Sequence, residues 1–125
     1  MPEPPQPQLL GKFGEDIARD VLTARGYAIL ATRHRTRFGE IDIVARHAGV
    51  LVFVEVKARR SSRRGSAIEA ISPAKRRRVA AMALDYLAWT GNLDAPCRFD
   101  VVAIDRAGSP AMTVRVIDHA WDVDN

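Results

Sequence analysis

The stretches GEIDIVA (residues 39–45) and VLVFVEVK (residues 50–57) decide the fold of this chain, and a short turn around Ala48-Gly49 separates them. Both have the β-branched composition of strands. The second is apolar almost throughout, which is typical of a central strand that is covered on both faces. Strict alternation along the first stretch puts Glu40, Asp42 and Val44 on one face of the sheet and Ile41, Ile43 and Ala45 on the other.

The turn also predicts which residues face each other across the hairpin. In a tight hairpin about Ala48-Gly49 the numbers of paired residues sum to 97, so Asp42 lies opposite Glu55. The same register places Glu40 opposite Lys57. Directly paired side chains have Cβ atoms roughly 4.5–5.5 Å apart, and two carboxylates repel each other strongly in a low dielectric. Mg²⁺ removes that repulsion, because it binds carboxylate oxygens, water and phosphate oxygens.

Lys57 adds a positive charge beside this cation position. A metal ion lowers the pKa of a bound water and polarises a phosphate, while a lysine orients the water or stabilises developing negative charge. These residues are therefore suited to phosphodiester hydrolysis. A plainer interpretation stays open: an ion pair of Lys57 with Glu40 or Asp42 at a solvated sheet end, which would contribute little to stability.

The rest of the chain predicts two helices and three further strands. Apolar residues recur every three or four positions from Leu9 to Arg25, which indicates an amphipathic helix. Ser72-Pro73 is typical of a helix start, and that helix is expected to run to Trp89. The strands are expected at residues 27–35, 38–47, 50–58, 98–105 and 112–117. This order predicts a mixed sheet with helices packed on it.

Periodicity and spacing alone indicate no functional role for four polar residues. Glu15 lies at the flank of the first helix's apolar stripe, so periodicity favours a solvated carboxylate. His34 and His47 lack metal-ligand spacing and are expected at the surface or at a sheet edge. Cys97 is the single cysteine, which excludes an intramolecular disulfide and indicates a partly buried thiol.

Charge is distributed unevenly along the chain. The net charge is +4, yet residues 33–78 hold 13 of the 19 Lys and Arg against four acids, so this segment carries +9 and the remainder −5. Such a cluster suggests a polyanionic partner, nucleic acid before membrane; a solvated basic surface is the alternative. The residues expected to bind nucleic acid are Arg35, Arg37, Arg59, Arg60, Arg63, Arg64, Lys75, Arg76 and Arg77.

Length and composition indicate one domain. The chain has 125 residues, of which 47% are hydrophobic and 27% charged. No apolar run approaches the roughly 18–20 residues that span a bilayer, and the N-terminus lacks the features of a signal peptide, so we expect a cytoplasmic location and no membrane partner. Residues 1–8 are Pro-rich and are expected to form a disordered leader, followed by a single domain at residues 9–125.

Four blocks of the sequence together resemble a known family. Asp42, followed after a gap by Glu55-Val56-Lys57, matches the D…(D/E)-x-K signature of the restriction-endonuclease-like nuclease superfamily. Within this superfamily, the four blocks together resemble the YraN family of small bacterial proteins. That family is expected to be nuclease-like and is similar to archaeal Holliday-junction resolvases. The blocks that carry the resemblance, over about residues 11–105, are GEDIA (14–18), GEID (39–42), VFVEVKAR (52–59) and RFDVV (98–102).

The resemblance implies an α/β fold with a restriction-endonuclease-like αβββαβ core and an active site on the second and third strands. The implied cofactor is Mg²⁺ or Mn²⁺, and Lys75 is implied to bind a phosphate. The implied catalytic residues are Asp42, Glu55, Lys57 and Glu15, and the implied metal ligands are Asp42, Glu55, Glu15 and the carbonyl of Val56.

The activity that follows is that of a metal-dependent endonuclease on branched or damaged DNA, selective for structure rather than sequence, and a homodimer would suit it. The junction specificity of resolvases does not carry over, because their DNA-binding loops and dimer surface are not recognisable in this sequence. The alternative is a nucleic-acid-binding module that keeps the fold without catalysis.

Overall fold

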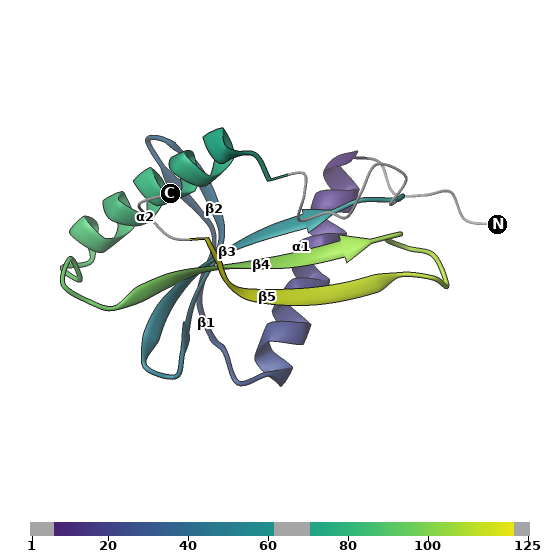
Figure 1. The fold of residues 1–125 in the computed structure, drawn as a ribbon, viewed down its shortest axis with the longest axis horizontal. Helices are drawn as coiled ribbons and strands as arrows, with labels where there is room; N and C mark the ends of the chain where they lie inside the picture. Colours follow the sequence, from purple (N-terminus) through teal and green to yellow (C-terminus); the bar gives the residue numbers. More distant parts are fainter. Residues whose placement is uncertain (1–6, 62–70, 122–125) are drawn as a thin grey trace.

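The computed structural model describes residues 7–61 and 71–121. The order of elements is the expected αβββαβ core followed by one more strand, and the restriction-endonuclease-like α/β fold is confirmed (Figure 1). The elements are α1 (Pro7–Ala24), β1 (Ala28–Thr36), β2 (Gly39–His47), β3 (Val50–Ala58), α2 (Pro73–Trp89), β4 (Cys97–Asp105) and β5 (Thr113–Trp121).

The five strands form one sheet in the order β1-β2-β3-β4-β5. Every neighbouring pair is antiparallel except β3 and β4, which are parallel. Parallel strands need a crossover connection, and here α2 makes it. The helix begins where the sequence predicts, since the Ser72 hydroxyl accepts the N–H of Lys75 at 3.1 Å and Pro73 follows directly.

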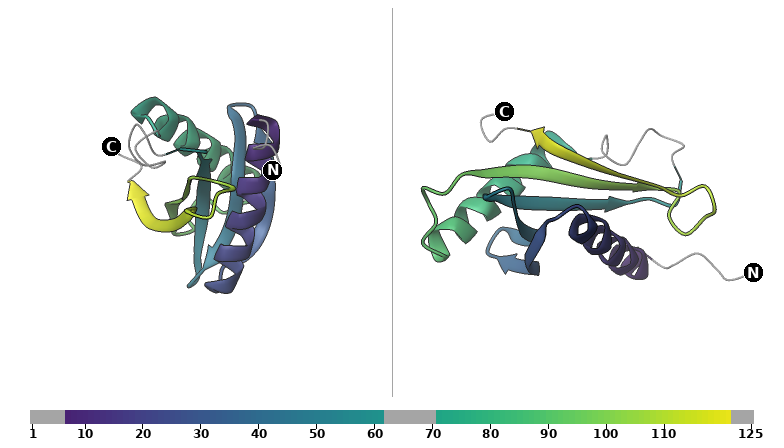
Figure 2. Two further views of the ribbon diagram at one scale, coloured as in Figure 1. Left: turned by 90° about the vertical axis from the view of Figure 1, so that its right-hand side faces the viewer. Right: turned by 90° about the horizontal axis from the view of Figure 1, so that it is seen from below.

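The two helices cover opposite faces of the sheet (Figure 2). On the α2 side, Met82 and Tyr86 pack in one core with Phe53 and Phe99. On the α1 side, Leu22 packs in a second core with neighbours that include Val52 and Val102. A central strand that contributes to both cores must be apolar on both faces, which explains the composition of β3.

Faces alternate as expected in β3 and β4 but not in β2. Ile41 and Val44 belong to the core under α2, whereas Ile43 and Ala45 belong to the core under α1. The expectation that Ile41 and Ile43 share a face is therefore wrong, and the strand changes faces at Asp42. On β1 the residue between those paired with Ile43 and Ile41 is Arg33, whose φ of +50° is left-handed.

Two elements extend two or more residues beyond their expected bounds. Helix α1 begins at Pro7 rather than Leu9, because proline is tolerated in the first turn of a helix. Strand β5 continues to Trp121 rather than ending at Ile117, because its pairing with β4 resumes past an irregularity, where the Trp121 ring stacks on Phe99 with centroids 5.2 Å apart. The expected leader lies, apart from its last two residues, outside the described ranges.

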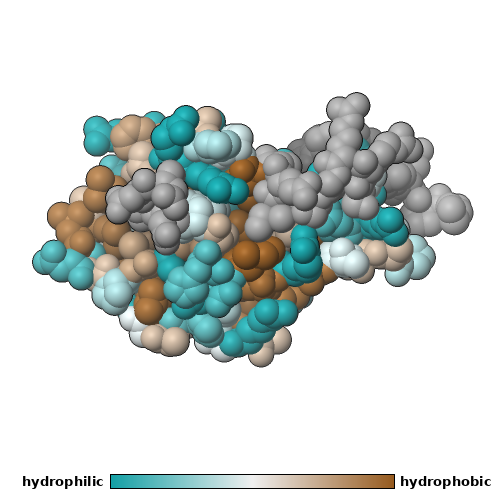
Figure 3. Space-filling model, in the orientation of Figure 1, coloured by the Kyte–Doolittle hydropathy of each residue, from teal (hydrophilic) through white to brown (hydrophobic). Residues whose placement is uncertain are grey.

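No helix in residues 7–61 and 71–121 is long and apolar enough to cross a membrane. Hydrophobic surface nevertheless remains at the end of the molecule where α2 lies (Figure 3). Large apolar side chains exposed in or just after α2 are Leu84, Trp89 and Leu93.

Candidate active site

Asp42 lies where the pairing of β2 with β3 ends. The predicted register is confirmed from His47 opposite Val50 to Ile43 opposite Val54, since these numbers sum to 97. The ladder stops there, so the pairs that were expected next, beginning with Asp42 and Glu55, are not backbone pairs. Instead the Asp42 carboxylate accepts the N–H of Val56 at 2.8 Å. A side chain thus occupies the place of a strand carbonyl, and the two strands separate at the acids.

The surroundings of Asp42 favour its protonated form. Burial, and next the charge of Glu55, raise the pKa of Asp42 to about 7, while the Val56 N–H and the charge of Lys75 act in the opposite direction. The carboxyl groups of Asp42 and Glu55 are therefore close enough to repel each other, as the hairpin register suggested.

Glu55 is a buried carboxylate that is only partly satisfied. Its side chain is 7% exposed, and its Oε1 lies 2.9 Å from Nζ of Lys75. Its Oε2 is buried and has no hydrogen-bond partner among the described residues. An unsatisfied buried oxygen is costly, so this atom is a position at which a cation would be stabilising.

Glu15 approaches the site from α1. The position of the helix depends on Gly14, where an added Cβ would lie 2.9 Å from Cβ of Ala58 at the end of β3. The Glu15 side chain is only 14% exposed and its Oε2 lies 2.6 Å from Nε of Arg33, so the solvated position favoured by periodicity is wrong. Its charge also raises the pKa of Asp42, which places it near the pair.

Lys57 follows Glu55 on the same face of β3 and is partly buried. It makes no hydrogen bond or ion pair with any other residue in the described part of the chain. Glu40, its alternative partner in a plain cross-strand ion pair, instead binds Arg35, with 2.8 Å between Oε2 and Nη2. The ammonium group of Lys57 is therefore not committed to either predicted carboxylate.

Two carboxylates of the site have the oxygen chemistry that suits a hard divalent cation. Within residues 7–61 and 71–121, no three Asp, Glu, His or Cys side chains are gathered tightly enough to hold a metal. Glu15 is engaged by Arg33, which leaves Asp42 and the orphan Oε2 of Glu55 as the facing oxygen donors. Carboxylate oxygens are the ligands Mg²⁺ and Mn²⁺ prefer, and the implied role of the Val56 carbonyl stays a prediction.

The basic residues that follow the acids in sequence have different contacts. Lys75 is bound to Glu55 at the start of α2, and Arg77, two residues farther along, is exposed. The guanidinium of Arg76 instead lies over the ring of Trp121 at 5.7 Å, with its Nε buried. Arg59 and Arg60 directly follow β3. Arg63 and Arg64 lie outside the described residues.

Arg35 and Arg37 belong to a separate place, the hairpin that joins β1 to β2. Arg35 binds Glu40, while Nε of Arg37 lies 3.7 Å from Oδ1 of Asp85 in α2. The predicted nucleic-acid-binding residues therefore do not form one patch, since Lys75 pairs with Glu55 at the start of α2, whereas the hairpin residue Arg37 lies beside Asp85, ten residues farther along that helix.

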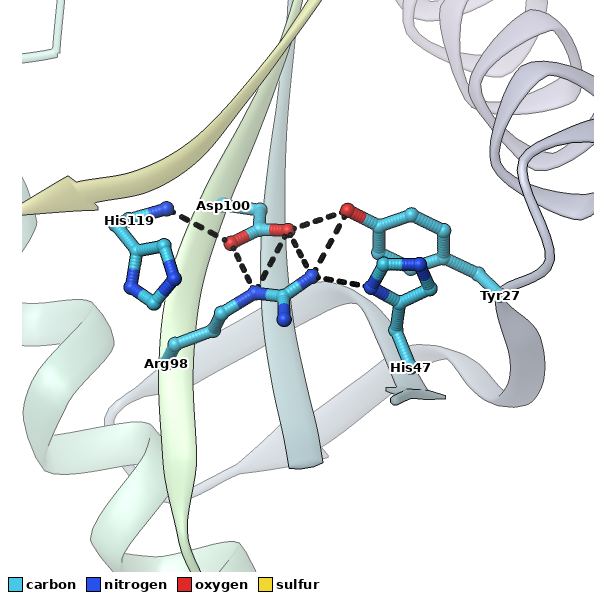
Figure 4. A network of polar contacts seen from close by, with 5 residues as sticks. All are labelled: Tyr27, His47, Arg98, Asp100 and His119. Atoms are coloured by element: carbon cyan, nitrogen blue, oxygen red, sulfur yellow. Dashed lines mark hydrogen bonds and ion pairs between the residues drawn. The ribbon is translucent and has the colours of Figure 1, made fainter. Parts of the chain in front are cut away.

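A second polar network escaped prediction (Figure 4). Asp100 is fully buried and accepts hydrogen bonds from Arg98 at 3.0 Å and from the Tyr27 hydroxyl at 2.7 Å. His47 stacks on Tyr27 with ring centroids 4.1 Å apart, and its Nδ1 lies 2.7 Å from Nη2 of Arg98. Burial first, and then Asp100, raise the pKa of Tyr27.

Both histidines are half-buried. His34 lies on β1, an edge strand of the sheet, as expected, and packs between Tyr86 and Trp89, whereas His47 lies at the end of β2 and belongs to this polar network. The sequence held one signal for the network: Arg98 and Asp100 stand in the RFDVV block. Cys97 is a partly buried thiol, as expected.

Comparison with known proteins gives one consistent family. The model of "Uncharacterised protein family UPF0102" matches residues 14–104. The UPF0102 protein of Symbiobacterium thermophilum is 47% identical over 112 residues, which cover 90% of this chain and 95% of that protein. The UPF0102 protein of Desulforapulum autotrophicum is 42% identical over 119 residues, which cover 95% and 98%. The chain belongs to the UPF0102 family, the YraN family that its sequence blocks resemble.

Proposed function

We propose that this protein is a metal-dependent nuclease that hydrolyses phosphodiester bonds in branched or damaged DNA. The observation that carries the proposal is the pair Asp42 and Glu55, two mutually repelling acids, one with its pKa raised to about 7 and the other with a buried orphan oxygen. A fold tolerates such a pair more readily when a cation completes it, since perturbed acids cluster at functional sites.

Each residue has a distinct part in the proposed reaction. A divalent cation held by Asp42 and Glu55 would polarise the scissile phosphate and lower the pKa of a bound water. Lys57, free of both carboxylate partners, orients the attacking water or stabilises the negative charge that develops on phosphorus oxygens. Lys75, which pairs with Glu55 in this structure, would bind a substrate phosphate through its ammonium group if a cation compensated that carboxylate.

A specific observation also favours the non-catalytic alternative. Lys75 and Arg33 already neutralise Glu55 and Glu15, so the site keeps part of its charge balance without any metal. A module that binds nucleic acid through its basic residues would need no more than this. We therefore keep a binding module as the second candidate, and we keep the cytoplasmic location and the homodimer as predictions.

Cleavage assays separate the two candidates. End-labelled linear, flapped and four-way DNA is incubated with Mg²⁺ or Mn²⁺ and with EDTA. We expect the wild type to cut at least one branched substrate in a metal-dependent manner, and Asp42→Asn and Lys57→Ala to lower the rate by about 100-fold or more with DNA binding retained. The matched control is Glu40→Gln, a carboxylate in the same strand that binds Arg35, and it should cut normally.

Intact DNA binding by a wild type that cuts none of these substrates with either metal would contradict the nuclease and support the binding module. Loss of cleavage in Glu40→Gln as large as in Asp42→Asn would instead show that any charge change in β2 suffices, and would remove the special role of Asp42.

A further inference from the structure

A groove separates the β1–β2 hairpin from the carboxyl-terminal half of α2, away from the acids. Its volume is about 580 Å³. We call it the aromatic groove, and the side chains that define it are His34, Arg35, Thr36 and Arg37 from the hairpin and Asp85 and Trp89 from α2. Figure 1 shows the hairpin lying beside α2.

One wall of the groove is a supported aromatic surface. Trp89 is 74% exposed, which is unusual for the largest apolar side chain in a protein. Its ring lies 5.3 Å from that of His34, which in turn packs edge-on against buried Tyr86 at 5.1 Å. The indole is thus held from one side and open on another. A nucleobase can stack on such a ring, and stacking contributes about 1–3 kcal/mol per base.

The other wall carries two guanidinium groups that are weakly committed. The side chains of Arg35 and Arg37 are 81% and 77% exposed, and both ion pairs with Glu40 and Asp85 are at the surface. Exposed ion pairs contribute little to stability, so a phosphate can compete for either guanidinium with a bidentate contact. A base-stacking ring opposite two phosphate-binding groups is the arrangement that binds single strands.

The groove and the acids share α2 as a common support. At Gly39 the hairpin lies against the helix, since an added Cβ there would be 3.3 Å from Sδ of Met82. From Lys75, which binds Glu55, to Trp89 the helix rises about 21 Å at 1.5 Å per residue. At the 3.4 Å rise per nucleotide of one strand of B-form DNA, that distance corresponds to about six stacked nucleotides.

We propose that the aromatic groove binds a single-stranded segment of the nucleic acid substrate, about six nucleotides from the bond cut beside Asp42 and Glu55. Trp89 stacks on a base, and Arg35 and Arg37 bind the flanking phosphates. This inference rests on the proposed nuclease function, and it makes the substrate a branched nucleic acid with a single-stranded arm rather than a fully paired duplex.

The protein carries its own reporter for this site. It has two tryptophans, and the other, Trp121, is 7% exposed and stacked on Phe99. Oligothymidine of about twelve nucleotides, within known single-strand site sizes, should therefore quench the fluorescence of Trp89. Trp89→Phe should bind with similar affinity but without most of the quenching, and Trp89→Ala should bind about 5- to 150-fold more weakly. The matched control is Leu84→Ala, a 60% exposed apolar residue of the same helix, which should bind normally.

The charged wall has its own test. Replacing Arg35 and Arg37 together with Gln should reduce the slope of log affinity against log salt by about 1.4, because each phosphate contact on a single strand contributes about 0.7. Arg115→Gln, an exposed arginine of β5, should leave the slope unchanged.

The outcomes separate this inference from the nuclease itself. The fluorescence titrations use Asp42→Asn, which should bind the oligonucleotide without cutting it. Quenching in these titrations, together with no cleavage by the wild type in the separate assay, would refute the nuclease and leave the groove supported. Cleavage by the wild type without quenching, or an affinity of Asp42→Asn that Trp89→Ala leaves unchanged, would overturn the groove. A third titration uses oligouridine of the same length. If oligouridine bound more than tenfold more tightly than oligothymidine, the result would contradict the link to DNA cleavage.

Discussion

Asp42 and Asp100 have the same backbone setting but opposite electrostatic surroundings. Asp42 lies where the β2–β3 ladder ends and Asp100 lies at the register shift between β4 and β5. Each carboxylate accepts a backbone N–H from the next strand, that of Val56 at 2.8 Å and that of His119 at 3.2 Å. A left-handed residue accompanies both irregularities, Arg33 beside Asp42 and His119 beside Asp100.

The difference lies in what surrounds each carboxylate. Asp100 is bound by Arg98 and by the hydroxyl of Tyr27, whereas Asp42 faces Glu55, another acid. A buried acid with donors on every side holds the sheet together, because its charge is compensated. A half-buried acid beside a second acid destabilises the metal-free fold and is poised for a cation. The same backbone geometry therefore supplies a structural site in one place and a candidate catalytic site in the other.

The largest expected effect is the loss of the compensated acid. Asp100→Ala leaves Arg98, 10% exposed, without its carboxylate partner, and breaking a buried pair in this way costs about 3–5 kcal/mol. Urea unfolding measures it, with the exposed Asp94→Ala as the control. A loss below about 1 kcal/mol would mean that Asp100 behaves as a surface ion pair does, and the contrast with Asp42 would fail.

A smaller effect is expected where α1 brings Glu15 to the acids. Gly14→Ala places a Cβ 2.9 Å from that of Ala58, so the helix must shift, at a cost of about 1–3 kcal/mol. Gly11→Ala in the same helix meets nothing within 4 Å and should stabilise by up to about 1 kcal/mol, since alanine favours helix.

Combining Gly14→Ala with Ala58→Gly should restore much of the stability, which a double-mutant cycle measures. Additive losses in that cycle would show that the close approach of α1 to β3 does not set the position of Glu15.

The substitution with the smallest expected effect has the opposite sign and is at Asp42 itself. Its pKa in the fold is about 7, above the ordinary value near 4. Between these values the folded state binds the proton and the unfolded state does not, so the free energy of unfolding should fall as pH rises from about 4 to about 7. Asp42→Asn should remove that decline and, at pH 8 without metal, stabilise the protein by about 1 kcal/mol.

Chemical unfolding across this pH range, in the presence of a chelator, measures both quantities. A wild type whose stability rises through the same interval, or a destabilised Asp42→Asn at pH 8, would show that Asp42 is a compensated acid like Asp100.

Local pattern predicted the elements, the hairpin register and the acids, because alternation and turn length act over a few residues. It failed at Asp42, where β2 changes faces. The residue across from Asp42 on β1 is Arg33, which has a left-handed backbone, and the sequence has no glycine or asparagine at that position to indicate it. The contacts of Arg98 with His47 and Tyr27 span 51 and 71 residues of sequence, beyond any local periodicity. Charge balance at the acids likewise depends on Lys75 and Arg33, which only the folded sheet and helices bring near.

Manganese binding tests the central claim, that Asp42 and Glu55 form a cation site, most directly. Calorimetric titration of the wild type in two buffers of different ionisation enthalpy reports both the affinity and the protons released. At about pH 6.5, below the pKa of Asp42, binding should release between about half and one proton, and at about pH 8.5 close to none; Asp42→Asn should not bind in the same concentration range. Absence of binding by the wild type, or equal binding by Asp42→Asn, would contradict the account.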